Sequence, residues 1–218
     1  MSITLTKGQE AARAATKSGK NLLISGPGGV GKSYLIDVIV DDLESAGKTV
    51  LVTASTGKAA TLIDGVTCHR AFHIPISMTW KAMPLVKEES PLLKADVVLI
   101  DEISMIRLDV FDFIVKSLNI VNKKRSPRKP IQLILVGDFA QLPPVIVEPK
   151  AGKPSEAALM SEYYGFDIKS GYAFNAPGWA QCDITVINLT EVQRGREYLN
   201  RSSCLCPHQS LELLLQQE

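Results

Sequence analysis

The chain has 218 residues, of which 45% are hydrophobic, and its formal net charge at pH 7 is +1. This length suits one α/β domain with a small appendage, and the apolar content is enough for a buried core. The sequence has no run of 18 apolar residues and no apolar stretch near its start. We therefore expect a cytoplasmic protein with neither a membrane span nor a secretory signal.

Short apolar runs alternate with amphipathic stretches in the first third of the chain. The periodicity predicts helices over residues 8–19, 32–46 and 56–63, and strands over residues 21–25 and 48–54. Gly19 and Gly47 come at the ends of the first two helical stretches, where glycine commonly stops a helix.

The remaining elements follow the same alternation. We predict strands over residues 96–100, 131–137 and 184–189, and helices over residues 108–121 and 173–182. Residues 143–169 lack periodicity and predict a long excursion. The continuous apolar runs are typical of strands that are buried on both faces. The pattern therefore predicts a three-layer α/β sandwich, with a mostly parallel sheet of about five strands between two layers of helices.

The sequence GPGGVGKS fits the pattern G-x-x-x-x-G-K-[ST] of a phosphate-binding loop. Its members are Gly26, Pro27, Gly28, Gly29, Val30, Gly31, Lys32 and Ser33. Glycines let backbone N–H groups surround phosphate oxygens, and the helix that follows points its N-terminus at the same charge. Lys32 is then expected to reach the β- and γ-phosphates, and the Ser33 hydroxyl to bind Mg²⁺. The alternative is a glycine-rich turn with an accidental lysine. That alternative gives no reason for a strand before the motif and a helix after it, and both are predicted here.

A second polar group follows the apolar run of residues 97–100. Asp101 and Glu102 stand at the carboxyl end of that predicted strand, where ligands bind in parallel sheets. Asp101 is placed to hold Mg²⁺, and Glu102 to orient and deprotonate an attacking water molecule. A solvated loop or a helix cap is the alternative for such a pair in isolation.

A third group, Asp138 and Gln141, follows the predicted strand of residues 131–137. A side-chain amide can hydrogen-bond both a γ-phosphate oxygen and the attacking water, so Gln141 could report the state of the nucleotide. The alternative is a turn capped by Asp138, and the spacing alone does not decide between them.

The motifs occur in the order LTKGQ, GPGGVGKS, VTASTGKAA, GVTCHRAFHIPI, VLIDEIS, VGDFAQLPPV and LTEVQR. This order resembles the superfamily 1 DNA helicases of the 5′-to-3′ subgroup, the Pif/RecD-like family, over residues 3–194. The resemblance implies a RecA-like P-loop NTPase domain over residues 1–195 that binds ATP and Mg²⁺. It also implies that the intact family enzyme couples ATP hydrolysis to movement along single-stranded DNA.

The resemblance assigns further roles near the nucleotide. Gln9 in LTKGQ matches a glutamine that reads the adenine edge, although the alternative is an ordinary residue at the start of a helix. Arg194 in LTEVQR matches an arginine that reaches the γ-phosphate.

Four residues match segments that contact single-stranded DNA in the family. Thr56 and Lys58 match a motif on the strand's sugar–phosphate backbone, where a hydroxyl and a cation suit phosphate. The family often has a non-basic residue at position 58. His69 and Phe72 match a segment that lines the DNA channel, where an aromatic ring can stack on a base. For Phe72, core packing is an equally good alternative.

A basic run over residues 122–130 contains Lys123, Lys124, Arg125, Arg128 and Lys129. It could add electrostatic affinity for a nucleic-acid backbone, but such runs are more often solvated connectors.

Residues 196–218 do not fit the family pattern, and we expect a poorly ordered tail. Cys204, Cys206 and His208 lie close together there, which allows a zinc site, but the C-x-x-C spacing and a fourth ligand are missing. Reduced thiols are the alternative.

In the family, a second RecA-like domain supplies another arginine and half of the DNA track. The change of character after Gly195 motivates the hypothesis of a truncated reading frame, with a partner chain as one source of the second motor domain. The lone chain would then bind ATP, hydrolyse it slowly and not unwind DNA. The alternatives are a non-catalytic module whose interactions depend on nucleotide, and a P-loop kinase for a small molecule.

Overall fold

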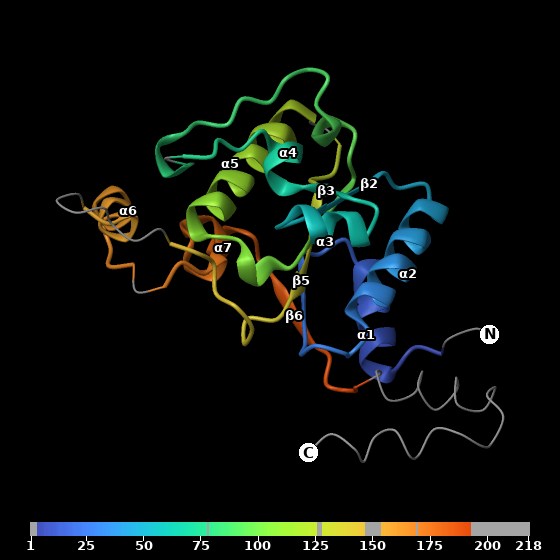
Figure 1. Cartoon of the computed structure of the whole chain (residues 1–218). Helices are drawn as coiled ribbons and strands as arrows, with labels where there is room; N and C mark the ends of the chain where they lie inside the picture. The colour runs from blue at the N-terminus through green and yellow to red at the C-terminus, as the bar shows by residue number, and fades with distance from the viewer. Residues whose placement is uncertain (1–3, 78, 126–127, 147–153, 169, 193–218) are drawn as a thin grey trace, which may run out of the picture.

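The computed structural model describes residues 4–77, 79–125, 128–146, 154–168 and 170–192 (Figure 1). Within these ranges, six parallel strands form one sheet in the order β3-β2-β4-β5-β1-β6. The strands are β1 (Leu22–Ser25), β2 (Val50–Ala54), β3 (Val66–Thr67), β4 (Val97–Asp101), β5 (Gln132–Gly137) and β6 (Thr185–Asn188). The sequence predicts five of them; β3 has only two residues, too few to show a period.

Helices cover both faces of this sheet. They are α1 (Lys7–Thr16), α2 (Lys32–Ser45), α3 (Gly57–Leu62), α4 (Cys68–Phe72), α5 (Leu108–Arg125), α6 (Glu156–Tyr164) and α7 (Pro177–Gln181). Single 3₁₀ turns are η1 (Thr79–Lys81), η2 (Pro91–Leu93), η3 (Ile103–Met105) and η4 (Ala173–Asn175). Figure 1 shows α1 and α2 on one side of the strands and α5 and α7 on the other. This is the predicted three-layer sandwich.

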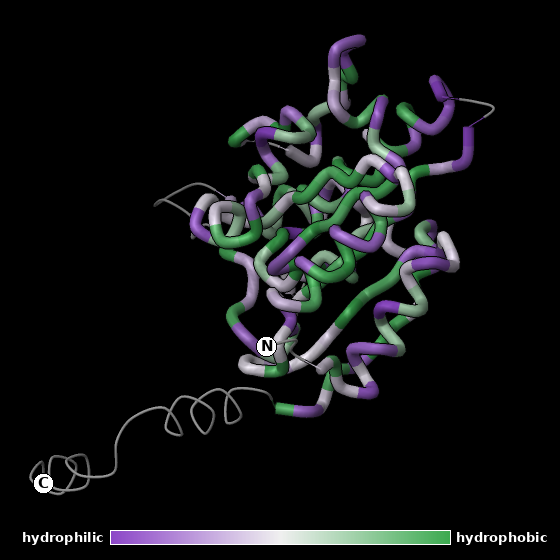
Figure 2. Tube along the Cα trace, turned by 90° about the vertical axis from the view of Figure 1, so that its right-hand side faces the viewer, coloured by the Kyte–Doolittle hydropathy of each residue, from purple (hydrophilic) through white to green (hydrophobic). Residues whose placement is uncertain are grey.

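Alternate residues of the central strands enter two separate hydrophobic cores. Leu99 of β4 packs in the core that contains Ile36 and Ile39 of α2, whereas Ile100 packs with Phe111 and Ile114 of α5. Figure 2 shows the hydrophobic stretches gathered in the middle of the molecule, with hydrophilic residues on the outer surfaces of the helices. Because both faces are covered, the strands need apolar residues at successive positions.

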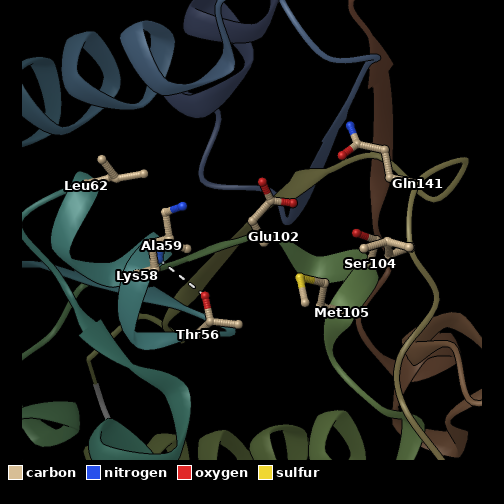
Figure 3. A pocket seen from close by; sticks show the side chains of 9 residues that line it. Thr56, Lys58, Ala59, Leu62, Glu102, Ser104, Met105 and Gln141 are labelled. Atoms are coloured by element: carbon tan, nitrogen blue, oxygen red, sulfur yellow. Dashed lines mark hydrogen bonds between the residues drawn. The ribbon is translucent and has the colours of Figure 1, made fainter.

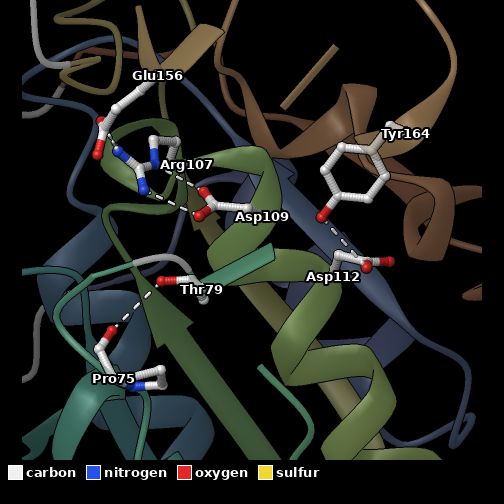
Figure 4. A network of polar contacts seen from close by, with 7 residues as sticks. All are labelled: Pro75, Thr79, Arg107, Asp109, Asp112, Glu156 and Tyr164. Carbon is white, nitrogen blue, oxygen red and sulfur yellow. Dashed lines mark hydrogen bonds and ion pairs between the residues drawn. The ribbon is translucent and has the colours of Figure 1, made fainter. Parts of the chain in front are cut away.

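The excursion predicted over residues 143–169 contains a helix, so the prediction of an irregular segment is wrong there. Ser155 caps the N-terminus of α6, and Gly165, at φ 75°, ends it. Only Met160 of this helix is buried, so the sequence carries no apolar stripe to reveal it. Figure 4 shows two polar contacts that hold α6 to the start of α5. Arg107 Nη1 donates to Glu156 Oε2 at 2.6 Å, and Tyr164 Oη donates to Asp112 Oδ2 at 3.4 Å.

The basic run over residues 122–130 is not wholly a solvated connector, because α5 continues through Arg125. The buried Arg125 donates to the carbonyl oxygen of Ala95 at 2.5 Å and to Asp96 Oδ1 at 3.2 Å. Arg128 donates to the same Asp96 oxygen at 2.7 Å, and Lys124 donates to the carbonyl oxygen of Val86 at 3.0 Å. Asp96 immediately precedes β4, so this part of the basic run is held against the amino end of that strand.

In the part of the chain that the structure describes, no helix is both long and apolar enough to cross a membrane. Cys68 and Cys182 are free and buried. The cluster of Cys204, Cys206 and His208, and the proposed boundary at residue 195, lie outside the described residues.

Candidate nucleotide-binding site

The predicted site residues come together because the sheet is parallel. The carboxyl ends of β1, β4 and β5 meet at one edge, and each is followed by one of the three polar groups. The P-loop follows β1, the acidic pair ends β4, and Asp138 with Gln141 follows β5. Ligands of open α/β sheets bind at this edge.

The P-loop begins in a tight space between two strand ends. The Gly26 N–H donates to the carbonyl oxygen of Gly137 at 3.2 Å, and a Cβ at Gly26 would stand 2.7 Å from the carbonyl oxygen of Leu189. Gly29 and Gly31 have φ angles of 86° and 78°, in the left-handed region that favours glycine. Gly26 is therefore required by the close approach of another backbone segment, and Gly29 and Gly31 by their left-handed backbone conformation.

Lys32 begins α2, and its side chain folds back over the loop. Its Nζ donates to the carbonyl oxygens of Gly26 at 2.6 Å and Pro27 at 3.0 Å. Ser33 follows in the first turn and is exposed. The loop therefore combines a cation with a helix N-terminus, two features that favour a bound phosphate.

Asp101 and Glu102 differ in their surroundings. Asp101 is buried, and burial, with the neighbouring Glu102 charge, raises the pKa of its carboxyl to about 6 despite the opposing effects of the Glu102 N–H and the Lys32 charge. Glu102 has φ 52° and ψ 46°, a left-handed turn that starts η3 and leaves its side chain half-buried. A cation beside Asp101 would offset the cost of its ionisation.

The geometry of Gln141 fits both readings of its motif. Its Nε2 donates to Asp138 Oδ2 at 2.9 Å, and Asp138 Oδ1 accepts from the Ala140 N–H at 3.0 Å, so Asp138 does cap the turn. The same Nε2 lies 4.0 Å from where a Cβ on Gly28 would stand. The exposed amide is therefore adjacent to the P-loop.

Beside the P-loop lies a cavity of about 260 Å³ that several elements line (Figure 3). Its lining residues are Thr56, Lys58, Ala59, Leu62, Glu102, Ser104, Met105, Gln141 and Leu142. It brings two candidates for ATP chemistry, Glu102 and Gln141, together with two candidates for DNA contact, Thr56 and Lys58. The sequence motifs did not single out Ala59, Leu62, Ser104, Met105 or Leu142. For Met105 and Leu142 the only available signal was their position directly after polar motifs.

The four predicted DNA contacts differ in exposure. Thr56 is the N-cap of α3, and its Oγ1 accepts from the Ala59 N–H at 3.2 Å, while Lys58 is exposed. His69 is exposed on α4. Phe72 is 3% exposed and packs in the core on the α5 side of the sheet. This burial favours core packing, the alternative given above, over stacking on a base.

Gln9 lies against the P-loop, 2% exposed. Its Oε1 accepts from the Thr6 N–H at 2.9 Å, and its Nε2 donates to the carbonyl oxygens of Val30 at 3.0 Å and Gly31 at 3.4 Å. The predicted adenine contact of this residue stays a prediction. Arg194 lies outside the described residues.

Oxygen donors at this edge fit a magnesium ion chemically. Ser33 offers a hydroxyl and Asp101 a carboxylate, and Mg²⁺ is commonly held by one or two such groups together with phosphate oxygens and water. Among the described residues there is no cluster of three or more His, Cys, Asp or Glu side chains that could hold a metal alone. A shared site of this kind needs the nucleotide to complete it.

The parallel sheet, with a P-loop after β1 and an acidic pair at the end of β4, defines a RecA-like P-loop NTPase domain. The chain belongs to the PIF1-like helicase family, whose model matches residues 5–201.

Curated relatives support this assignment. The chain is 32% identical to the human ATP-dependent DNA helicase PIF1 over 195 residues, which are 87% of this chain and 27% of the relative. It is 31% identical to the ATP-dependent DNA helicase RRM3 of Saccharomyces cerevisiae over 204 residues, 89% of this chain and 26% of the relative. The chain thus spans about a quarter of these relatives.

Solved structures show the same relationship. A crystal structure of Bacteroides Pif1 bound to ssDNA matches with a TM-score of 0.71 and 30% identity, over 91% of this chain and 45% of that one. A structure of Bacteroides sp. Pif1 in complex with ADP-AlF4 matches with a TM-score of 0.69 and 29% identity, over 91% and 45% of the two chains.

Proposed function

We propose that this chain is the ATP-binding N-terminal motor domain of an ATP-dependent 5′-to-3′ DNA helicase. The observation that carries the proposal is the convergence of Lys32, Asp101, Glu102 and Gln141 at the carboxyl edge of one parallel sheet. The relatives point the same way: PIF1 and RRM3 are ATP-dependent DNA helicases, and Bacteroides Pif1 structures contain ADP-AlF4 or ssDNA.

Each group at this edge has a physical role in ATP hydrolysis. Lys32 exchanges its two carbonyl contacts for the β- and γ-phosphates, where its charge offsets the charge that develops during phosphoryl transfer. Ser33 and Asp101 would hold Mg²⁺, which neutralises phosphate charge when bound. The Glu102 carboxylate faces the cavity and accepts a proton from the attacking water. Arg194 is proposed to reach the γ-phosphate.

The shared cavity offers a route from nucleotide to DNA. Gln141 lies beside the P-loop and also lines the cavity that Thr56 and Lys58 enter from α3. A change at the γ-phosphate that moves the Gln141 amide would therefore also change the cavity wall next to the proposed DNA contacts. Thr56 and Lys58 would bind the sugar–phosphate backbone of a single strand, a contact that does not depend on base sequence. His69 would line the channel that holds this strand.

By itself, the 218-residue polypeptide is proposed to bind MgATP, hydrolyse it slowly and not unwind DNA. The match to the solved Bacteroides Pif1 chain covers 45% of that chain. An arginine missing from such a site typically lowers turnover by about 10³–10⁵, or roughly 4–7 kcal/mol of barrier. A partner polypeptide that carries a second motor domain would restore the rate.

ATP turnover of the purified chain, with and without single-stranded DNA, tests the proposal beside a Glu102→Gln variant. Turnover that rises with DNA and disappears in the variant supports a DNA-stimulated ATPase. Binding of MgATP without turnover in either condition would instead support a non-catalytic module whose interactions depend on nucleotide. Failure of the chain to bind MgATP at all would refute both.

A further inference from the structure

Asp138 closes the turn that follows β5 at three points. Its backbone carbonyl oxygen accepts from the Gln141 N–H at 3.0 Å, and its Oδ1 accepts from the Ala140 N–H at 3.0 Å. Its Oδ2 accepts from Gln141 Nε2 at 2.9 Å. Asp138 is 8% exposed, whereas Gln141 is exposed. The aspartate is therefore the buried base of a turn that carries the glutamine on its outer side.

Phe139 fixes the same turn to the core on the α5 side of the sheet. Its ring meets three other rings edge-on, with centroid distances of 5.8 Å to Tyr172, 5.1 Å to Phe174 and 6.1 Å to Trp179. Edge-to-face pairs of this kind attract each other. Because the turn is held in this way, its own side-chain torsions and the carboxylate beneath it decide how the Gln141 amide lies.

The Asp138 carboxylate selects which end of the Gln141 amide faces it. A carboxylate only accepts hydrogen bonds, so it binds the Nε2 end of the amide and not Oε1. One N–H is used in this contact, which leaves the second N–H and the Oε1 acceptor for a ligand. Nε2 lies 4.0 Å from where a Cβ on Gly28 would stand, so these two groups are beside the P-loop.

The donor and the acceptor that remain match the two partners proposed for Gln141. A γ-phosphate oxygen accepts, so it needs the N–H, whereas the attacking water can donate to Oε1. Glu102 lines the same cavity as Gln141 and is the second acceptor for this water (Figure 3). An amide flipped end for end would place Oε1 against the Asp138 carboxylate and would offer the water no acceptor.

We propose that Asp138 is a positioning residue for ATP hydrolysis. It touches neither nucleotide nor water, but holds the Gln141 amide with a donor toward the γ-phosphate and its acceptor toward the attacking water. The proposal rests on the nucleotide binding and hydrolysis proposed above. Its consequence is specific, because Asp138 and Gln141 should act as one unit, and only ligands with a γ-phosphate should depend on that unit.

The informative change is Asp138→Asn. The new side chain keeps one oxygen for the Ala140 N–H but places an amino group against Gln141 Nε2. Two donors cannot pair, so the Gln141 amide must turn and exchange the positions of its donor and acceptor. Turnover at saturating MgATP should therefore fall by about tenfold or more, and the affinity for MgADP should not change.

A double-mutant cycle of Asp138→Asn and Gln141→Ala tests the proposal without depending on turnover. Calorimetry gives the affinities for adenylyl imidodiphosphate, whose γ-phosphate is not hydrolysed, and for ADP, both with Mg²⁺. Each single variant should lower the ratio of the two affinities by about tenfold, and the double variant should lower it no further.

An unchanged ratio in either single variant, or effects that multiply to about a hundredfold in the double variant, would overturn the proposal. An unaltered chain that bound neither ligand would refute the proposed function itself.

Asp112→Asn is the matched control for stability. Asp112 is 5% exposed and accepts from Tyr164 Oη at 3.4 Å, outside the cavity that Gln141 lines. This variant should lower the melting temperature and leave the affinity ratio unchanged. If it lowered the ratio as much as Asp138→Asn does, the ratio would follow stability, and Asp138 would be merely structural.

Discussion

Arg107 holds the carboxylate of Asp109 at two points, with Nε to Oδ1 at 2.6 Å and Nη2 to Oδ2 at 2.9 Å (Figure 4). The Asp109 side chain has 0% exposure, and the guanidinium also lies 5.8 Å from the centre of the Trp80 ring. The remaining guanidinium nitrogen of Arg107, Nη1, donates to Glu156 on α6. One cation therefore fixes the start of α5, the turn η1 and the excursion that carries α6.

Replacing Arg107 by Met should lower the free energy of unfolding by about 3–5 kcal/mol, because it leaves a buried carboxylate without its cation. The measurement is denaturant unfolding at pH 7. Arg13→Met is the matched control, since Arg13 makes a similar two-point contact with Asp42 at a more exposed site. Its cost should be clearly smaller, because solvent screens an exposed ion pair. Equal costs for the two variants would contradict the assignment of Arg107 as a buried anchor.

Asp101 should make the protein less stable as pH rises. Its pKa, about 6, exceeds the ordinary value of 3.8, so the native state holds this proton more tightly than the unfolded chain does. The contribution of Asp101 to stability is thus present below about pH 4 and is lost as pH rises through about 6. The full difference corresponds to about 3 kcal/mol.

Asp101→Asn should therefore raise the free energy of unfolding at pH 8 by about 1–3 kcal/mol, measured without nucleotide or divalent cations. The same variant should lose the Mg²⁺-dependent part of ATP binding. An Asn variant that was less stable than the unaltered chain at pH 8 would show that the charged carboxylate is stabilised by its neighbours in the apo protein.

Prediction from the sequence worked best where the local pattern of apolar residues matches the burial of the strands in the sheet. Residues 97–100 and 133–136 are continuous apolar runs because the strands are covered on both faces, and polar groups follow them at the functional edge. That is why the P-loop, Asp101, Glu102 and Gln141 could be placed before the structure was known.

Contacts between distant segments could not be read in the same way. Arg125 lies in a basic run that resembles a solvated loop, but its partners are Ala95 and Asp96, about 30 residues away. Gln9 lies in a motif typical of helix starts, but its donors reach Val30 and Gly31. Helix α6 was missed because a helix with one buried residue has no apolar period.

The contrast between Phe72 and His69 on α4 can be measured. Phe72→Ala should lower the free energy of unfolding by about 3–5 kcal/mol, because it empties a core position. His69→Ala should change stability by about 0.5 kcal/mol or less, because the side chain is exposed.

Their effects on single-stranded DNA should be reversed. The conservative Phe72→Leu variant keeps an apolar side chain in the core, so affinity for a fluorescent oligonucleotide should not change. His69→Ala should weaken it. Reduced DNA affinity for Phe72→Leu but not for His69→Ala would contradict this assignment. It would mean that DNA contacts the side of α4 that is buried in this structure.

Replacement of glycine by alanine should have opposite effects on stability at Gly26 and at Gly57. A Cβ at Gly26 would stand 2.7 Å from the carbonyl oxygen of Leu189 and 3.0 Å from Val30 Cγ2, so either the P-loop or the end of β6 must move. At Gly57, the first residue of α3, a Cβ meets nothing within 4 Å.

Gly26→Ala should therefore lower the free energy of unfolding by about 1–3 kcal/mol. It should weaken ATP binding too, because the displaced segment is the P-loop, whose backbone N–H groups surround the phosphates. Gly57→Ala should be neutral or stabilising by up to about 1 kcal/mol, since it restricts the unfolded chain without a clash. Thermal unfolding of the two variants with and without MgATP gives both quantities. A Gly26→Ala protein with unchanged stability and unchanged ATP-induced stabilisation would mean that the strand ends around the P-loop can separate at little cost.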